Sequence, residues 1–186
     1  GANAVNGVIN IITKNSANTK GLYGEAAYGN AMPGSASLRY GGKIAKGLTY
    51  RAYATGYRMS NTLDTNHLSA KDEWAMGQGG LRMDWNASEK DQLSLLANAY
   101  YGRPNPDGDT TAIIASGDNA TAKWNHKFSE KADFQLQVYY DHTWRDFGNK
   151  FTEDLKTYDI DWQNRYQIGK RHTITHGLGY RQMEHN

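Results

Sequence analysis

The segment FQLQVYYDHTWRDF, residues 134–147, decides the fold class of this chain. Apolar side chains at Phe134, Leu136, Val138 and Tyr140 alternate with polar ones, and this period of two is typical of a β-strand with one apolar face. At about 3.3 Å per residue the segment would reach roughly 46 Å. Strands of soluble β-sandwiches are usually about 5–6 residues long. Tilted by about 45°, the segment would be long enough to cross an apolar band about 25 Å tall.

The same alternation recurs on both sides of this segment, from Lys20 almost to the last residue. It predicts an all-β chain of about nine antiparallel strands. The apolar positions that recur in this way are Leu22, Ala26, Ala36, Leu38, Tyr40, Leu48, Tyr50, Ala52, Ala54, Leu81, Met83, Trp85, Leu93, Leu95, Ala97, Ala99, Ala120, Ala122, Trp124, Tyr158, Ile160, Trp162, Tyr166, Ile168, Ile174, Leu178 and Tyr180.

The connections between these segments alternate in length. Short turns are predicted near Lys46, Lys90, Lys131 and Lys170, and longer loops at Ser60–Glu73, Arg103–Gly117 and Gly148–Leu155. Short turns at one edge and long loops at the other are typical of transmembrane β-barrels. The turns recur about every 40 residues, as in β-propellers, but each period here holds two long strands instead of the four short strands of a propeller blade.

Aromatic residues gather where the predicted strands end. Such clustering is expected of two aromatic girdles at membrane interfaces. The residues near the short turns are Trp85, Phe128 and Tyr166, and those near the long loops are Tyr28, Trp74, Tyr101 and Trp144.

Composition narrows the function classes. The 186 residues carry a net charge of +2 with both signs mixed, which argues against a nucleic-acid-binding surface. The absence of cysteine excludes disulfides and thiolate sites. The mean hydropathy is −0.80 and no run of about 18 apolar residues occurs, so no transmembrane helix is expected and any membrane crossing would use paired β-strands. Residue 1 is not Met and nothing resembles a signal peptide, so we expect an internal piece of a longer protein.

The N-terminal stretch adds a family resemblance. Gly7–Lys14, GVINIITK, is a β-branched run that predicts a short buried strand after a turn of small residues. It resembles the end of the plug domain of TonB-dependent outer-membrane receptors, where Tyr-Gly-x-x-Ala-x-x-Gly-Val-Ile-Asn-Ile-Ile-Thr-Lys precedes the first barrel strand; Ala4 and Gly7–Lys14 match. The resemblance implies that residues 1–19 are the end of a plug with a polar linker at Asn15–Lys20. Residues 20–186 would then be the N-terminal portion of a transmembrane antiparallel β-barrel of about 22 strands.

What this family resemblance implies is transport and not catalysis. It implies TonB-dependent import of a scarce substrate, most often a ferric siderophore or another iron complex, across the outer membrane of a Gram-negative type cell. The implied partners are TonB, through a segment N-terminal to this chain, outer-membrane lipid and the small-molecule substrate; no cofactor and no nucleic acid are expected. The loops Ser60–Glu73 and Arg103–Gly117 are candidates for substrate capture, and no individual substrate-binding residue is predicted.

Three alternatives stay open. The same transporter could carry cobalamin, heme or an oligosaccharide. A small closed barrel of about eight strands could have a structural or adhesive role. A soluble β-sandwich lectin would also produce alternating strands.

Polar clusters point to no catalytic, cofactor or metal site. A ladder of charged residues shares the polar side of the strands, and we expect it to line the lumen and contact the plug: Arg39, Arg51, Arg82, Asp84, Lys123, Asp141, Arg145, Asp159, Asp161 and Arg165. His172 and His176 would lie roughly 13 Å apart on one strand face, too far to share a metal ion. His126, His142 and His185 have no partner at metal-ligand spacing. The group Asn105, Asp107, Gly108 and Asp109 resembles a calcium loop but lacks its later Glu, so an exposed turn is expected.

Overall fold

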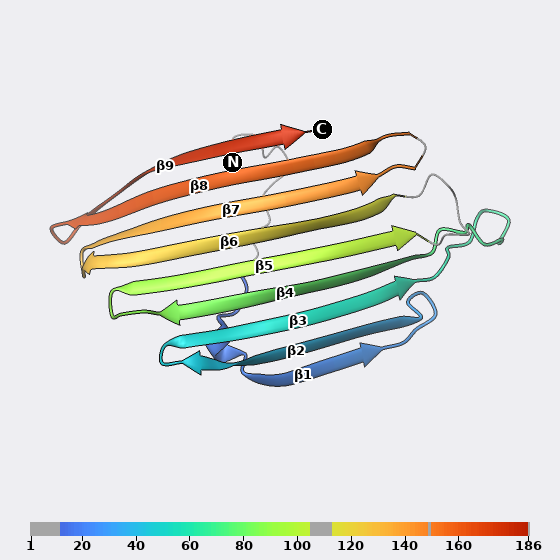
Figure 1. The fold of residues 1–186 in the computed structure, drawn as a ribbon, viewed down its shortest axis with the longest axis horizontal. Helices are drawn as coiled ribbons and strands as arrows, with labels where there is room; N and C mark the ends of the chain where they lie inside the picture. The colour runs from blue at the N-terminus through green and yellow to red at the C-terminus, as the bar shows by residue number, and fades with distance from the viewer. Residues whose placement is uncertain (1–11, 105–112, 149, 186) are drawn as a thin grey trace.

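Nine strands form one antiparallel sheet in the computed structural model, which describes residues 12–104, 113–148 and 150–185. The strands follow one another in sequence order, so each pairs with its neighbours along the chain (Figure 1). This confirms the predicted all-β antiparallel class and the strand number. The sheet is open, with β1 and β9 at its two edges. The elements are a 3-10 turn η1 (Ser16–Asn18), β1 (Gly21–Ala27), β2 (Gly34–Ala45), β3 (Leu48–Met59), β4 (Trp74–Asn86), β5 (Asp91–Pro104), β6 (Ile114–Ser129), β7 (Ala132–Asp146), β8 (Thr152–Ile168) and β9 (His172–His185).

The strands are long, as their sequences predict. β1 has 7 residues, whereas β2–β9 have between 12 and 17. The β7–β8 pair, for example, runs without interruption from Ala132 opposite Tyr166 to Asp146 opposite Thr152. This continuous pairing satisfies the backbone donors and acceptors along the strands, except on the outer sides of β1 and β9.

The alternation of short turns and long loops is also confirmed. Two to four residues join β2 to β3, β4 to β5, β6 to β7 and β8 to β9 at one edge of the sheet, which we call the short-turn edge (Figure 1). Three predicted loop boundaries are wrong: β5 continues to Pro104, and two strands begin early, β6 at Ile114 and β8 at Thr152. Pairing with β7 explains both, because Ala115 lies opposite Arg145 and Asp146 lies opposite Thr152.

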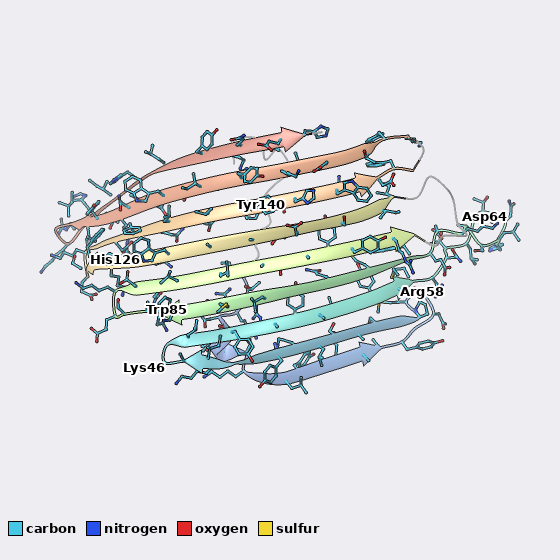
Figure 2. All side chains as sticks on the ribbon, viewed as in Figure 1. Lys46, Arg58, Asp64, Trp85, His126 and Tyr140 are labelled. Carbon is cyan, nitrogen blue, oxygen red and sulfur yellow. The ribbon has the colours of Figure 1, made fainter. Side chains whose placement is uncertain are left out.

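The register sorts the side chains onto two faces. Every member of the predicted charged ladder falls on one face, called the polar face. The other, called the apolar face, has a row of consecutive cross-strand partners that we call the tryptophan row: Leu48, Trp85, Leu93, Trp124, Leu136, Trp162 and Leu178. Trp85, His126 and Lys46 are each labelled in Figure 2 close to the short-turn edge.

One aromatic assignment is wrong. Trp74 was grouped with a girdle near the long loops, but it packs edge-on against Tyr57, with ring centroids 5.3 Å apart. The strand register places both rings on the polar face, because Trp74 has the same parity as Gln78 and Arg82 in β4. The position of Trp74 in the sequence, next to the loop, correctly predicts that it lies at the end of the strand. The face on which its side chain lies depends on whether its residue number is odd or even, because successive side chains of a strand point to opposite faces.

The sheet has no second layer among the described residues. No apolar side chain in that part of the chain is buried, and the buried side chains are polar: Ser16, Thr19, Thr49, Asp84 and Asn164. On the apolar face Val138 is 46% exposed, Ile160 44% and Leu178 75%. An apolar surface of this extent is normally covered, by protein or by membrane.

A glycine on the polar face allows a tyrosine to lie across its neighbouring strand. A Cβ atom added to Gly80 would lie 2.5 Å from Cε1 of Tyr53 and 2.9 Å from the carbonyl oxygen of Ala97. The Tyr53 hydroxyl in turn donates to Oδ1 of Asn98 at 2.9 Å and accepts from Nε2 of Gln78 at 2.8 Å.

We therefore expect Gly80→Ala to lower the free energy of unfolding by about 1–3 kcal/mol, because the added methyl group overpacks the site and displaces this hydrogen-bonded tyrosine. The matched control is Gly77→Ala in the same strand, where no atom lies within 4 Å of the added Cβ. Chemical denaturation of the two variants measures the difference. Equal stabilities would contradict this account of Gly80.

Candidate functional site

The segment Thr13–Thr19 lies on the polar face of β2, β3 and β4. Ser16 is fully buried and Thr19 is 5% exposed. Asn15 caps the short turn, its Oδ1 accepting from the amide of Ala17 at 2.9 Å. A polar segment buried this completely against a strand face needs specific hydrogen-bond partners.

Asp84 in β4 supplies most of those partners. Its Oδ2 accepts from the amide and from the hydroxyl of Ser16, each at 2.7 Å. Arg82 donates to the same carboxylate through Nε and Nη2, both at 2.7 Å, in the bidentate geometry that makes such pairs strong. The Ser16 hydroxyl is also 2.7 Å from Oγ1 of Thr49. All of these groups are buried or nearly so, and together they fix the position of Ser16.

Two arginines extend the contact toward the N-terminus. Arg82 Nη1 donates to Oγ1 of Thr13 at 2.7 Å and to its carbonyl oxygen at 3.2 Å. Arg51 Nη1 donates to the carbonyl oxygen of Lys14 at 2.9 Å. On the other side, the carbonyl of Thr19 lies so close to Gly41 that a Cβ there would overlap it. We call this set of contacts, between Thr13–Thr19 and the residues Gly41, Thr49, Arg51, Arg82 and Asp84, the N-terminal clamp.

The clamp corrects the prediction for Asn15–Lys20. The sequence predicts a polar linker there; the stretch is polar, but Ser16 and Thr19 are buried because the strands provide partners for their hydroxyl and amide groups. Of the predicted strand Gly7–Lys14, residues 7–11 lie outside the described part, and Ile12–Lys14 are not in a strand. One feature of the sequence points to the clamp: Arg82 and Asp84 share a face of one strand.

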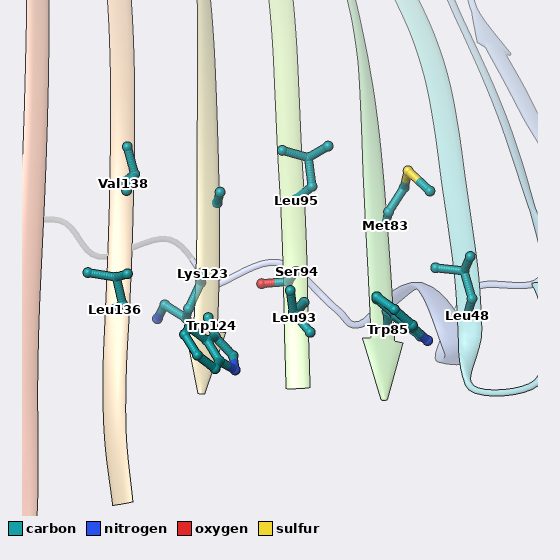
Figure 3. Close-up of a pocket in the computed structure, with 11 residues that line it drawn as sticks. Leu48, Met83, Trp85, Leu93, Ser94, Leu95, Lys123, Trp124, Leu136 and Val138 are labelled. Carbon is teal, nitrogen blue, oxygen red and sulfur yellow. The ribbon is translucent and has the colours of Figure 1, made fainter. Parts of the chain in front are cut away.

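A shallow depression lies on the apolar face, across β3 to β7 (Figure 3). Its volume is about 300 Å³. Trp85 and Trp124 lie at its end nearest the short turns, and Leu95, Ala122 and Val138 line the part farther from them (Figure 3). The small side chain of Ala122, between the larger Leu95 and Val138, leaves the space open.

The candidate capture loop Ser60–Glu73 folds into a small hairpin. Leu63 and Ser69 form an antiparallel bridge, and Oδ1 of Asp64 accepts from the amides of Asn66 and Leu68, each at 2.8 Å. An ion pair of 2.7 Å between Arg58 and Glu73 closes its base. The loop extends beyond the long-loop edge of the sheet (Figures 1 and 2). The second candidate loop, Arg103–Gly117, is described only at its ends.

Asp72 ties the hairpin together in a way that depends on pH. Its carboxylate accepts from the Thr62 hydroxyl at 2.6 Å and from the Thr62 amide at 2.7 Å. These two hydrogen bonds hold the pKa of Asp72 below its usual range, and the bond from the hydroxyl has the larger effect. Because the pKa is lower in the folded state, the contact stabilises the loop fully at pH values above the ordinary aspartate pKa of about 3.9. This stabilisation is lost as the pH falls through the lower pKa of the folded state.

We expect the amide resonance of Thr62 to titrate with a midpoint below about 3.9, the ordinary aspartate value. An NMR titration of the protein measures it. In Asp72→Asn the transition should disappear while the resonances of the sheet stay unchanged. A midpoint at or above the ordinary value would contradict the hydrogen-bonded loop.

His126 and His142, for which spacing along the chain predicts no metal-ligand partner, are paired with carboxylates from neighbouring strands. Nδ1 of His126 lies 2.7 Å from Asp91. His142 lies between two acids, with Nδ1 3.2 Å from Asp118 and Nε2 3.0 Å from Asp154. Cross-strand neighbours cannot be deduced from spacing along the chain, so the sequence does not indicate these pairs.

The remaining histidine and metal predictions concern the end of the chain and one loop. His176 stacks on Tyr166, with centroids 5.8 Å apart. Within the described residues no group of three or more His, Asp or Glu is arranged to hold a metal ion. Asn105, Asp107, Gly108 and Asp109 lie outside the described part.

Comparisons with known proteins add no assignment. No family model matches the sequence, and no significant match is found among curated proteins. In the described part of the chain, no helix has the length and apolar character needed to span a membrane.

Proposed function

We propose that this chain forms part of the wall of a TonB-dependent outer-membrane receptor, and that the receptor imports a ferric siderophore or another iron complex. The observation that carries the proposal is the two-faced sheet. One face is apolar and exposed, while the other is charged and holds Thr13–Thr19 through the N-terminal clamp. The plug-like sequence Gly7–Lys14 leads directly into that clamp.

The apolar face supports a membrane location. Along β7 the apolar side chains follow one another from Phe134 to Tyr140, and beyond them His142 pairs with Asp118 and Asp154 on the same face. Toward the short turns, the tryptophan row is followed by His126 and Asp91. An apolar belt with polar and aromatic borders is the pattern expected of a barrel exterior. A β-sandwich lectin would cover this face with a second sheet, and the described residues form only one.

The polar face supports a lumen that contains a plug. Transferring a charged side chain into lipid costs free energy, whereas a charged side chain that faces water or polar protein does not carry this cost. Arg51, Arg82 and Asp84 already bind the segment that enters from the N-terminal side. In a plugged barrel this arrangement would fasten the end of the plug to the inner wall near the short turns.

The iron cargo rests on the family resemblance, and the hairpin Ser60–Glu73 is the part of the described chain best placed to meet a substrate. It extends from the long-loop edge and has Leu63 and Leu68 exposed at 66% and 64%. Its internal hydrogen bonds give it a defined shape. A preformed loop loses less conformational entropy on binding than a flexible one.

Uptake by cells tests the proposal. The full-length protein, expressed in Gram-negative cells without receptors of their own, should import at least one radiolabelled ferric siderophore, and only when TonB is present. Deleting Leu63–Leu68 should reduce uptake without reducing the amount of protein in the membrane. Import of cobalamin, heme or an oligosaccharide instead would contradict the proposed iron cargo but would support the proposed class of transporter. Uptake that does not depend on TonB, or no uptake of any of these, would overturn the proposal in favour of a small structural barrel.

A further inference from the structure

Lysines in the short turns, aromatic rings and aliphatic side chains follow one another along the sheet, counted from the short-turn edge. Each short turn carries an exposed lysine: Lys46, Lys90, Lys131 and Lys170. Within the described residues none of these four ammonium groups forms an ion pair. We call them the lysine rim.

On the apolar face the paired Asp91 and His126 come next, then the tryptophan row, and then the depression. Trp85 is 45% exposed and Trp124 39%. The indole Nε1 of Trp124 donates to Asp91 at 3.0 Å, so its polar edge is directed to the short-turn end and its ring borders the depression (Figure 3). Beyond the two rings the lining is aliphatic, with Leu95, Ala122 and Val138.

This order of charge, aromatic ring and aliphatic groove matches an anionic amphiphile. We propose that the depression holds an acyl chain of an anionic glycerophospholipid whose phosphate lies at Lys46 and Lys90. Those two lysines precede Leu48 in β3 and Leu93 in β5, and both leucines line the depression. A volume of about 300 Å³ is at the lower end of small-ligand pockets, which suits part of one chain.

The charges complement the headgroup chosen. Positive side chains at a membrane surface attract anionic lipids, by about fivefold in affinity for each lysine. A zwitterionic lipid would gain far less from the lysine rim. The proposal depends on the proposed function, because the apolar face must lie in a bilayer.

Tryptophan quenching by brominated lipids tests it. The full-length protein is reconstituted in bilayers of phosphatidylcholine, with phosphatidylglycerol or phosphatidylcholine brominated on the acyl chain added at the same mole fraction. Three variants each keep one of the five tryptophans. The fluorescence of Trp85 or Trp124 reports on the depression, and that of Trp74 reports on the polar face. We expect brominated phosphatidylglycerol to quench Trp85 and Trp124 at a lower mole fraction than brominated phosphatidylcholine, and neither lipid to quench Trp74.

Substitutions locate the site. Lys46→Gln with Lys90→Gln should weaken the preference for phosphatidylglycerol by roughly fivefold per lysine removed. Lys170→Gln, in the same rim but away from the depression, should leave it unchanged. Ala122→Leu should fill the groove and reduce quenching by phosphatidylglycerol with the rim intact.

The outcomes separate this proposal from the proposed function. Equal quenching by the two lipids, or a preference that survives Lys46→Gln with Lys90→Gln, would overturn the lipid site while leaving the membrane wall in place. No quenching of Trp85 or Trp124 by either lipid, with no cross-linking of the face to a second copy of the chain, would overturn both proposals. Trp85 and Trp124 shielded from both lipids, with the face cross-linking to a second copy of the chain, would make the depression a protein interface and overturn the lipid site.

Discussion

With the apolar face in the membrane, as proposed, we expect Ile160→Arg to prevent the full-length protein from assembling there and Gln163→Arg in the same strand to leave assembly intact; this is the largest effect that we expect on the apolar face. Ile160 lies between Val138 and Tyr180, one row farther from the short turns than the tryptophan row. An arginine on the lipid side near the midplane of a barrel costs about 2–4 kcal/mol. Gln163 lies on the polar face, where an arginine stays in a polar environment.

A second pair tests how this cost depends on depth. Leu136 belongs to the tryptophan row, so Leu136→Arg should impair assembly less than Ile160→Arg, since the cost falls to about 0–1 kcal/mol near the interface. Gln137→Arg, on the polar face between Lys123 and Asp161, is its control. Protease protection and resistance to unfolding in detergent measure assembly. If substitutions on both faces had the same effect, the assignment of the faces would be wrong.

The fold could be predicted because the alternation is a local signal. Phe134–Phe147 specified a strand, its apolar face and its length from its own residues, and β7 covers Ala132–Asp146. Strand ends were less accessible, because they depend on partners. Ala115 belongs to β6 since Arg145 lies opposite it, and nothing near Ala115 in the sequence indicates this.

The site was harder to predict than the fold. Ser16 looks like any serine in a polar linker, and its burial follows from Asp84, which is 68 residues away. The pairs of His126 with Asp91 and of His142 with Asp118 and Asp154 likewise join different strands. Residue types and their spacing placed Arg51, Arg82 and Asp84 on the correct face. Which members of that ladder hold the N-terminal segment became clear only from the register.

The N-terminal clamp should open when Asp84 is changed. The side chains of Arg82 and Asp84 are only 15% and 10% exposed, and removing one partner from a buried ion pair typically costs about 3–5 kcal/mol. Asp84→Ala leaves the guanidinium of Arg82 and both donors of Ser16 without their acceptor. Because Lys14 and Lys20 flank the clamped turn, trypsin should cut after them faster in Asp84→Ala than in the wild type. Asp161→Ala, an exposed acid on the same face, is the control.

Gly41→Ala opens the same clamp by a different route. The added methyl group would overlap the carbonyl oxygen of Thr19 without changing any charge, whereas Gly77→Ala meets nothing. Both Gly41→Ala and Asp84→Ala should therefore release Thr13–Thr19. If trypsin cut at the wild-type rate in both, the clamp would not hold the segment. Faster cutting in Asp84→Ala alone would locate the effect in β4 itself.

The combination of Arg82→Ala with Asp84→Ala separates the charge from the hydrogen bonds to the segment. Removing both partners leaves no uncompensated buried charge, so the double variant should be more stable than Asp84→Ala alone. The segment should nevertheless stay released, because Ser16 loses Asp84 in both variants and Thr13 also loses Arg82 in the double variant. The free energy of unfolding would then depend on the ion pair, while the protection of Lys14 and Lys20 from trypsin would depend on the contacts to Ser16. In a plugged barrel the second property matters for transport, because force on the plug would be borne where Thr13–Thr19 is fastened to the wall.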